Sequence, residues 1–132
     1  MKRIVLAVLV MVFIGFTGLA QAQTWVPTNA ITVAWDAVTV PSGTVSYKLY
    51  IKPATGGTES FAQTVTGTTA TVSFPVEGRY YIGVRTVRSV DGIELESSNI
   101  GWSNDAAYVM NGATFGAQYY IAPGNITGLR IQ

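Results

Sequence analysis

The sequence predicts an all-β protein, built as an antiparallel β-sandwich. Three observations lead to this prediction. β-branched and aromatic residues recur at every second position in several short runs. Gly, Pro, Asn and Asp residues that favour turns separate these runs at fairly even intervals. Beyond residue 22, no window long enough for a helix keeps its apolar residues at helical spacing.

The first 22 residues have the features of a signal peptide. Lys2 and Arg3 precede an apolar run over residues 4–16, and Ala20-Gln21-Ala22 is a small-residue cleavage signal. The run is shorter than the roughly 20 residues of a membrane-spanning helix, so cleavage is favoured over retention as a membrane anchor. We expect a secreted protein, extracellular or periplasmic, with one domain over residues 23–121 and a tail over residues 122–132.

The charge and the amino-acid composition exclude several classes of function. The whole chain has 8 Lys and Arg against 7 Asp and Glu, and two of the cations, Lys2 and Arg3, lie in the predicted signal peptide. This balance gives no electrostatic attraction to nucleic acid. The sequence contains neither His nor Cys, which removes Ser-His-Asp and Cys-His catalysis, disulfides and Cys/His metal sites.

The carboxylates of Asp and Glu are the remaining candidates for catalysis or metal binding. They are scattered over predicted turns and polar strand faces, where solvated carboxylates are usual, so we expect no enzyme and no cofactor. Asp91, Glu94 and Glu96 lie close in sequence and could supply oxygen ligands to calcium. Their spacing matches no defined calcium loop, and a solvated loop is the favoured interpretation.

The alternating runs predict the strands and the core. Residues 23–29 are expected to form an extended leader. Strands are expected over residues 31–38, 45–52, 59–65, 70–74, 79–87 and 93–102, with 59–65 at a sheet edge. The apolar face of these strands predicts one buried cluster: Trp35, Tyr47, Leu49, Val72, Phe74, Tyr80, Ile82 and Val84.

The stretch FPVEGRYYIGVRTV, residues 74–87, is the most informative about the fold, because a turn is followed in it by a long alternating run. Together with Trp35 and the even strand spacing, it resembles a fibronectin type III domain over residues 31 to about 104. In that family a core Trp lies where Trp35 lies. The resemblance also places Phe74 at the end of one strand and Tyr80 at the start of the next, with the tyrosine hydroxyl capping the corner. It implies a fibronectin type III/immunoglobulin-like sandwich that acts as a binding or spacing module.

The ends of the chain depart from the family pattern. Too few residues lie between Pro27 and Ile31 for a full first strand and its turn. Asn111-Gly112 stands between β-prone runs over residues 106–121 and predicts an added C-terminal β-hairpin, because both residues accept a positive φ. Trp25 and Trp102, near the ends of the matched region, are expected to cover the open ends of the core.

The tail over residues 122–132 resembles the first strand of a further fibronectin type III domain. Three interpretations stay open. The tail is an interdomain linker, or it folds back onto an edge strand of its own chain. In the third, it adds to the open edge of the next subunit and builds head-to-tail filaments.

A candidate binding face follows from the strand alternation. Lys48, Tyr50, Lys52, Arg79, Tyr81 and Arg85 are expected to point outward. The family resemblance implies that their two strands are neighbours, so that these residues share one face suited to binding. We expect an interaction or adhesion module that binds a protein or a polysaccharide at the cell surface. The alternatives are a polysaccharide-binding module and a structural subunit that self-associates by strand addition. For the face itself, the favoured interpretation is structural: Tyr50 and Tyr81 form a cross-strand pair that stabilises the sheet, and the cations serve solubility.

Overall fold

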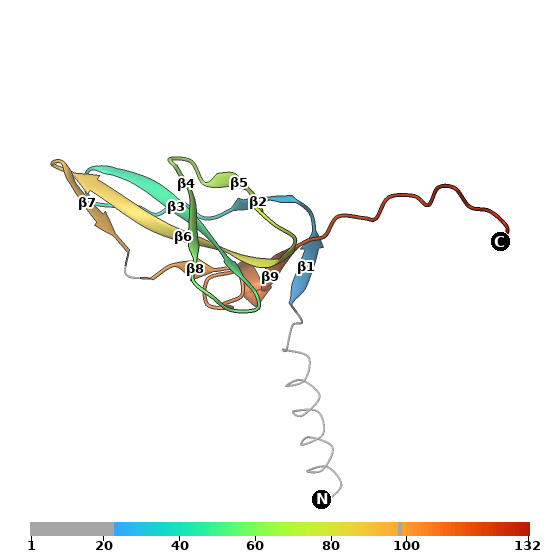
Figure 1. The fold of residues 1–132 in the computed structure, drawn as a ribbon. Coiled ribbons are helices and arrows are strands. Elements are labelled where there is room, and N and C mark those ends of the chain that lie inside the picture. The colour runs from blue at the N-terminus through green and yellow to red at the C-terminus, as the bar shows by residue number, and fades with distance from the viewer. Residues whose placement is uncertain (1–22, 98) are drawn as a thin grey trace, which may run out of the picture.

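The computed structural model describes residues 23–97 and 99–132, so the predicted signal peptide lies outside the described residues. The described residues form an all-β molecule with one short 3-10 helix (Figure 1). Its elements are β1 (Thr24–Pro27), β2 (Ala30–Ala34), β3 (Thr44–Pro53), β4 (Ser60–Val65), β5 (Thr69–Ser73), β6 (Gly78–Val90), β7 (Ile93–Glu96), β8 (Gly101–Trp102), η1 (Met110–Gly112) and β9 (Phe115–Tyr119).

The strands form a large and a small sheet. The large sheet has the order β1-β9-β6-β3-β4, and β7 and β8 pair with other parts of the long strand β6. The small sheet is the antiparallel pair β2-β5. The expected antiparallel arrangement is wrong at one place, because β1 pairs with β9 in parallel, with Thr24 opposite Phe115. Almost the whole domain lies between these two strands, so the long connection that a parallel pair needs is available.

One hydrophobic core contains residues from both sheets. Ile31, Val33 and Val72 of the small sheet join a cluster with buried residues of the large sheet, namely Leu49, Ile51, Tyr80, Ile82 and Ala117, and with Phe74. Of the expected core, Tyr47, Leu49, Val72, Phe74, Tyr80 and Ile82 are buried. Trp35 and Val84 are only half-buried and pack against the cluster, which corrects their expected placement. A pocket lies beside both side chains and accounts for their exposure.

The corner before β6 matches the expectation drawn from residues 74–87. The Tyr80 hydroxyl donates a hydrogen bond to the carbonyl oxygen of Val76 at 2.7 Å. The rings of Phe74 and Tyr80 stack with centroids 4.8 Å apart. Tyr80 therefore satisfies a carbonyl of the turn while its ring fills the core, which is how a tyrosine corner works.

The strand predicted over residues 93–102 is two short strands. β7 follows β6 through the two-residue turn Asp91-Gly92, whose φ values of 50° and 77° are those of a tight hairpin. β8 pairs with β6 further back, where Trp102 lies opposite Gly83. Both strands use β6 as their partner, so β6 is paired over most of its length.

The predicted C-terminal hairpin over residues 106–121 is wrong. Asn111 and Gly112 do adopt positive φ values of 58° and 67°, but they belong to a compact segment of turns and η1. The strand after them, β9, pairs with β6 on one side and β1 on the other. This position buries Ala117 completely, which a two-stranded hairpin on the surface would not do.

Both ends of the domain also differ from expectation. The leader over residues 23–29 contains β1, so a first strand exists and belongs to the large sheet. The tail over residues 122–132 has no regular secondary structure and is exposed throughout. It extends away from both sheets rather than folding back on the domain (Figure 1). Pairing of the tail with an edge of its own chain is therefore not the arrangement in this structure.

Candidate functional site

The six residues of the candidate binding face lie on β3 and β6, which are adjacent. In the register of the two strands, Lys48 is opposite Arg85 and Lys52 is opposite Tyr81. Their sequence neighbours Leu49, Ile51, Tyr80 and Ile82 point inward and are buried. Because side chains alternate along a strand, the six candidates share the surface of the large sheet that faces away from the core, which we call the outer face.

Two tryptophans that the sequence interpretation assigned to the core ends lie on the outer face instead. A Cβ placed on Gly83 would come within 2.7 Å of the Trp102 ring, and one placed on Gly116 would come within 2.5 Å of the Trp25 ring. Each ring therefore packs closely on a glycine in a neighbouring strand. The signal in the sequence was a glycine inside an otherwise β-branched and aromatic run, which often marks close approach of another group.

The outer face carries a row of aromatic rings across the large sheet, which we call the aromatic row: Phe61, Tyr50, Trp102, Tyr81 and Trp25. Trp25 and Tyr81 stack with centroids 5.5 Å apart, and Tyr50 meets Phe61 edge-on at 5.8 Å. The expected cross-strand pair of Tyr50 and Tyr81 is wrong. Tyr50 lies opposite Gly83 and Tyr81 lies opposite Lys52, so the two tyrosines are diagonal neighbours.

Cations lie over the rings of the aromatic row. The guanidinium of Arg79 is 4.8 Å from the Trp25 ring centre, and the Lys52 ammonium is 4.2 Å from that of Trp102. These distances are within the range of cation–π attraction. Arg79 also donates a hydrogen bond from Nε to Gln118 Oε1 at 3.1 Å. The rings and cations therefore hold one another in place across the strands.

Glu96 on β7 neutralises only part of this positive charge. It pairs with the Lys48 ammonium and with the Arg85 guanidinium, the latter at 3.2 Å. The hydrogen bond from Lys48 holds the pKa of the Glu96 carboxyl below its ordinary value, and the same bond raises the pKa of Lys48. Within the described parts of the chain, Lys52 and Arg79 form no ion pair. They are the cations of the outer face available to an acidic ligand.

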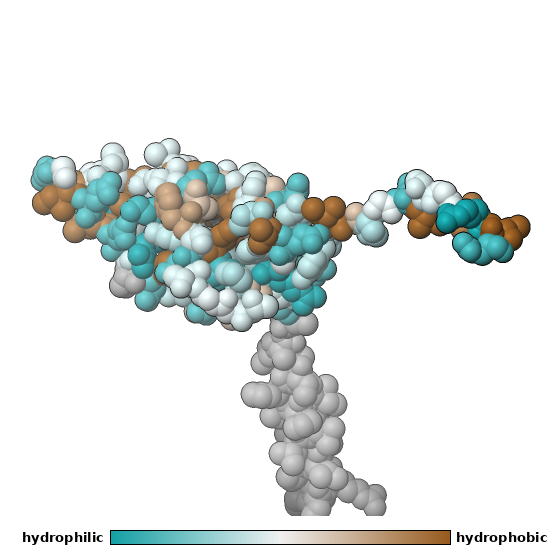
Figure 2. All heavy atoms as spheres, viewed as in Figure 1, coloured by the Kyte–Doolittle hydropathy of each residue, from teal (hydrophilic) through white to brown (hydrophobic). Residues whose placement is uncertain are grey.

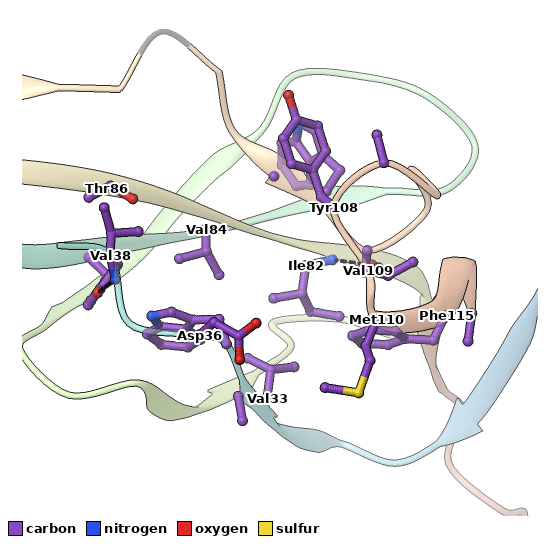
Figure 3. Close-up of a pocket in the computed structure, with 18 of the residues that line it drawn as sticks. Val33, Asp36, Val38, Ile82, Val84, Thr86, Tyr108, Val109, Met110 and Phe115 are labelled. Carbon is purple, nitrogen blue, oxygen red and sulfur yellow. Dashed lines mark hydrogen bonds between the residues drawn. The ribbon is translucent and has the colours of Figure 1, made fainter.

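A pocket of about 820 Å³ opens on the other side of the large sheet. Its wall is mostly apolar, with Val33 and Val38 from β2 and the loop after it, Ile82 and Val84 from β6, and Met110 from η1 (Figure 3). Ser103 Oγ accepts a hydrogen bond from the Ile82 backbone N–H at 3.1 Å and is used structurally. Among the described residues that line the pocket, Asp36 is the single carboxylate, so they offer no pair of acids for acid–base chemistry.

The three acidic residues considered as calcium ligands do not form a group that could hold one ion. Asp91 occupies the turn after β6, and Glu94 and Glu96 lie on β7. Among residues 23–97 and 99–132, no three Asp or Glu side chains are placed to share a metal ion. Glu96 is instead occupied by its two cations.

Comparisons with known proteins identify no relative from which a function could be inferred. No family model matches the chain, and neither the curated proteins nor the solved structures contain a match. None of the helical residues that the structure describes forms a helix long and apolar enough to cross a membrane.

Proposed function

We propose that the chain is a secreted, non-enzymatic adhesion module with a fibronectin type III-like sandwich. In this proposal its outer face binds an acidic polysaccharide at the cell surface. Support for the fold type comes from the hydrogen bond of Tyr80 to Val76 and from the core shared by β2, β5 and the large sheet. Because fold alone does not determine function, the ligand is argued from the outer face.

The observation that carries the proposal is the aromatic row with its unpaired cations. The row crosses the sheet from Phe61 on the edge strand β4 to Trp25 on the edge strand β1. An extended, flat surface of this kind fits a linear polymer better than a small molecule, which needs a concave pocket. Aromatic rings present apolar surface to sugar rings, while Lys52 and Arg79 offer charge-assisted hydrogen bonds to carboxylates.

Binding of polygalacturonate by the purified protein tests the proposal, with neutral dextran as the comparison polymer. Arg79→Glu reverses a charge within the aromatic row and should weaken polygalacturonate binding at least about tenfold, since charged contacts of this kind contribute about 1.5–3 kcal/mol each. Binding to polygalacturonate should also weaken as salt is added.

The matched control is Arg88→Glu, which reverses the same charge on the same strand. Arg88 bonds to Ser42 beyond the aromatic row, so this variant should bind almost as the parent does. Equal binding to both polymers, or an Arg79→Glu variant that keeps full affinity, would refute the proposal. Capture of an acidic protein without binding to the polysaccharide would also refute it.

A further inference from the structure

One edge of the small sheet is free. Within the described parts of the chain, β2 pairs only with β5. The bonds from Trp35 N to Thr68 O and from Phe74 N to Asn29 O show that odd-numbered residues of β2 bond to β5. In an antiparallel pair, alternate residues point their N–H and C=O groups the other way. The backbone groups of Thr32 and Ala34 are therefore directed at the free edge.

This edge lacks the usual protection. The five residues of β2, AITVA, include no charge and no proline, which are the features that normally prevent pairing with another chain. The opposite edge of the small sheet is different, because Gln63 of β4 donates a hydrogen bond to the Thr71 carbonyl oxygen at 2.7 Å. The free edge of β2 is thus the open position in the small sheet.

The apolar pocket adjoins the same strand. Val33 of β2 lines it, and Val38 and Met110 at its wall are 44% and 75% exposed. Figure 3 shows Val84 and Ile82 of β6 between Val38 and Met110. A strand added to β2 would therefore find an apolar surface beside it for its inward side chains.

The C-terminal tail has the complementary properties. Ile126, Leu129 and Ile131 are 80%, 87% and 98% exposed, and hydrophobic atoms are visible at the end of the tail in Figure 2. In an extended strand, Leu129 and Ile131 would share one face and Arg130 would lie on the other. Alternation of this kind is typical of a half-buried strand, yet no strand that the structure describes pairs with the tail.

We propose that the tail of one copy of this protein adds as a strand to the free edge of β2 in a second copy. Leu129 and Ile131 face the pocket, and the backbone groups of Thr32 and Ala34 pair with the incoming strand. The partner is a second copy, since the tail leaves its own domain after Ile121, whose N–H bonds to Glu77, and extends away from both sheets. Donor and acceptor are different surfaces, so the contact repeats head to tail.

A two-component experiment tests this proposal directly. The acceptor-only protein lacks residues 125–132. The donor-only protein carries Thr32→Pro, which removes an N–H from the free edge and leaves the backbone bonds to β5 in place, although the hydroxyl bond of Thr32 to Thr71 is lost. By light scattering, the parent should form concentration-dependent oligomers and each altered protein should stay monomeric. A mixture of the two should form heterodimers only.

Substitutions in the tail and at the pocket give matched controls. Leu129→Asp in the donor and Met110→Asp in the acceptor should each abolish the heterodimer. Arg130→Asp, on the other face of the tail, and Ile93→Asp, on the distant β7 hairpin, should keep it. Circular dichroism and the melting temperature of every variant report whether it is folded.

Three outcomes would overturn the proposal. A parent that is monomeric at millimolar concentration contradicts it. At a concentration where the parent is itself monomeric, a truncated protein that is less stable than the parent shows that the tail pairs within its own chain. Oligomers that survive the truncation show that another surface joins the copies. Each result is independent of polysaccharide binding, because the outer face and the free edge belong to different sheets.

Discussion

Gly83 decides where Trp102 can lie. Its Cα is covered by the Trp102 ring and by Ile100, whose Cγ2 would be 2.5 Å from an added Cβ. We expect Gly83→Ala to lower the free energy of unfolding by about 1–3 kcal/mol, because overpacking in a rigid site displaces its neighbours. Urea denaturation measures the effect. Gly67→Ala is the control, since no atom lies within 4 Å of its added Cβ, and it should be neutral or slightly stabilising.

The hydrogen-bonded ion pair of Glu96 and Lys48 predicts how its contribution to stability depends on pH. The Lys48 hydrogen bond holds the pKa of the Glu96 carboxyl below its ordinary value. The stabilisation from this carboxylate is therefore present above its unfolded-state pKa and is lost as the pH falls through the folded-state pKa. For Lys48, whose pKa is raised, the stabilisation is present below the unfolded-state pKa and is lost as the pH rises through the folded-state pKa.

The measurement is an NMR titration of the Glu96 side-chain carboxyl carbon. In the Lys48→Met variant we expect its midpoint to move up toward the ordinary glutamate range, because the main donor to the carboxylate is gone. Lys52→Met removes a charge of the outer face that is not bonded to Glu96, and should leave the midpoint where it is. Equal midpoints in the parent and the Lys48→Met variant would contradict the ion pair.

At the scale of elements, the attachment of β1 to the large sheet depends on the ring of Trp25. β1 has only four residues and a single partner strand, β9. Trp25 anchors it through contacts with Gly116, Tyr81 and Arg79. We expect Trp25→Ala to release β1 while the rest of the sheet stays folded, because short edge elements open with the smallest free energies.

Hydrogen exchange followed by mass spectrometry measures this release. Amides of residues 24–26 and 28 should exchange much faster in Trp25→Ala, while those of β3 and β6 keep their protection. Trp102→Ala removes the other tryptophan of the outer face and should leave β1 protected. Loss of protection throughout the protein in Trp25→Ala would mean that β1 is required for the whole fold.

At the scale of the whole molecule, Trp35 joins the core to the pocket. It is half-buried and meets Tyr47 edge-on at 5.2 Å, and its buried Nε1 has no hydrogen-bond partner among residues 23–97 and 99–132. We expect Trp35→Ala to lower the free energy of unfolding by about 2–3 kcal/mol, less than the ~3–5 kcal/mol typical of a buried aromatic. Thermal and urea unfolding measure it, and an unchanged melting temperature would place Trp35 outside the core.

Local patterns in the sequence predicted the inner and outer faces of the central strands of this protein. The alternation of Leu49, Ile51, Tyr80 and Ile82 assigns inner and outer faces without reference to any partner, because the period of a strand is a property of its backbone. The tyrosine hydroxyl that caps the turn was implied by the family resemblance at Phe74 and Tyr80, and the bond from Tyr80 to Val76 is found in the structure. The adjacency of β3 and β6, and with it the grouping of the six outer-face candidates, came from the family resemblance and is found in the structure.

Only the tertiary structure decided which partner each remaining strand takes. Asn111-Gly112 has the backbone of a hairpin turn, yet β9 pairs with β6 and β1, since that place in the large sheet buries Ala117 and satisfies both edges of β9. Trp25 and Trp102 lie on the outer face because Gly83 and Gly116 leave room for rings on strands distant in sequence. Such choices depend on long-range pairing, whose free energy is a sum over contacts that no local pattern contains.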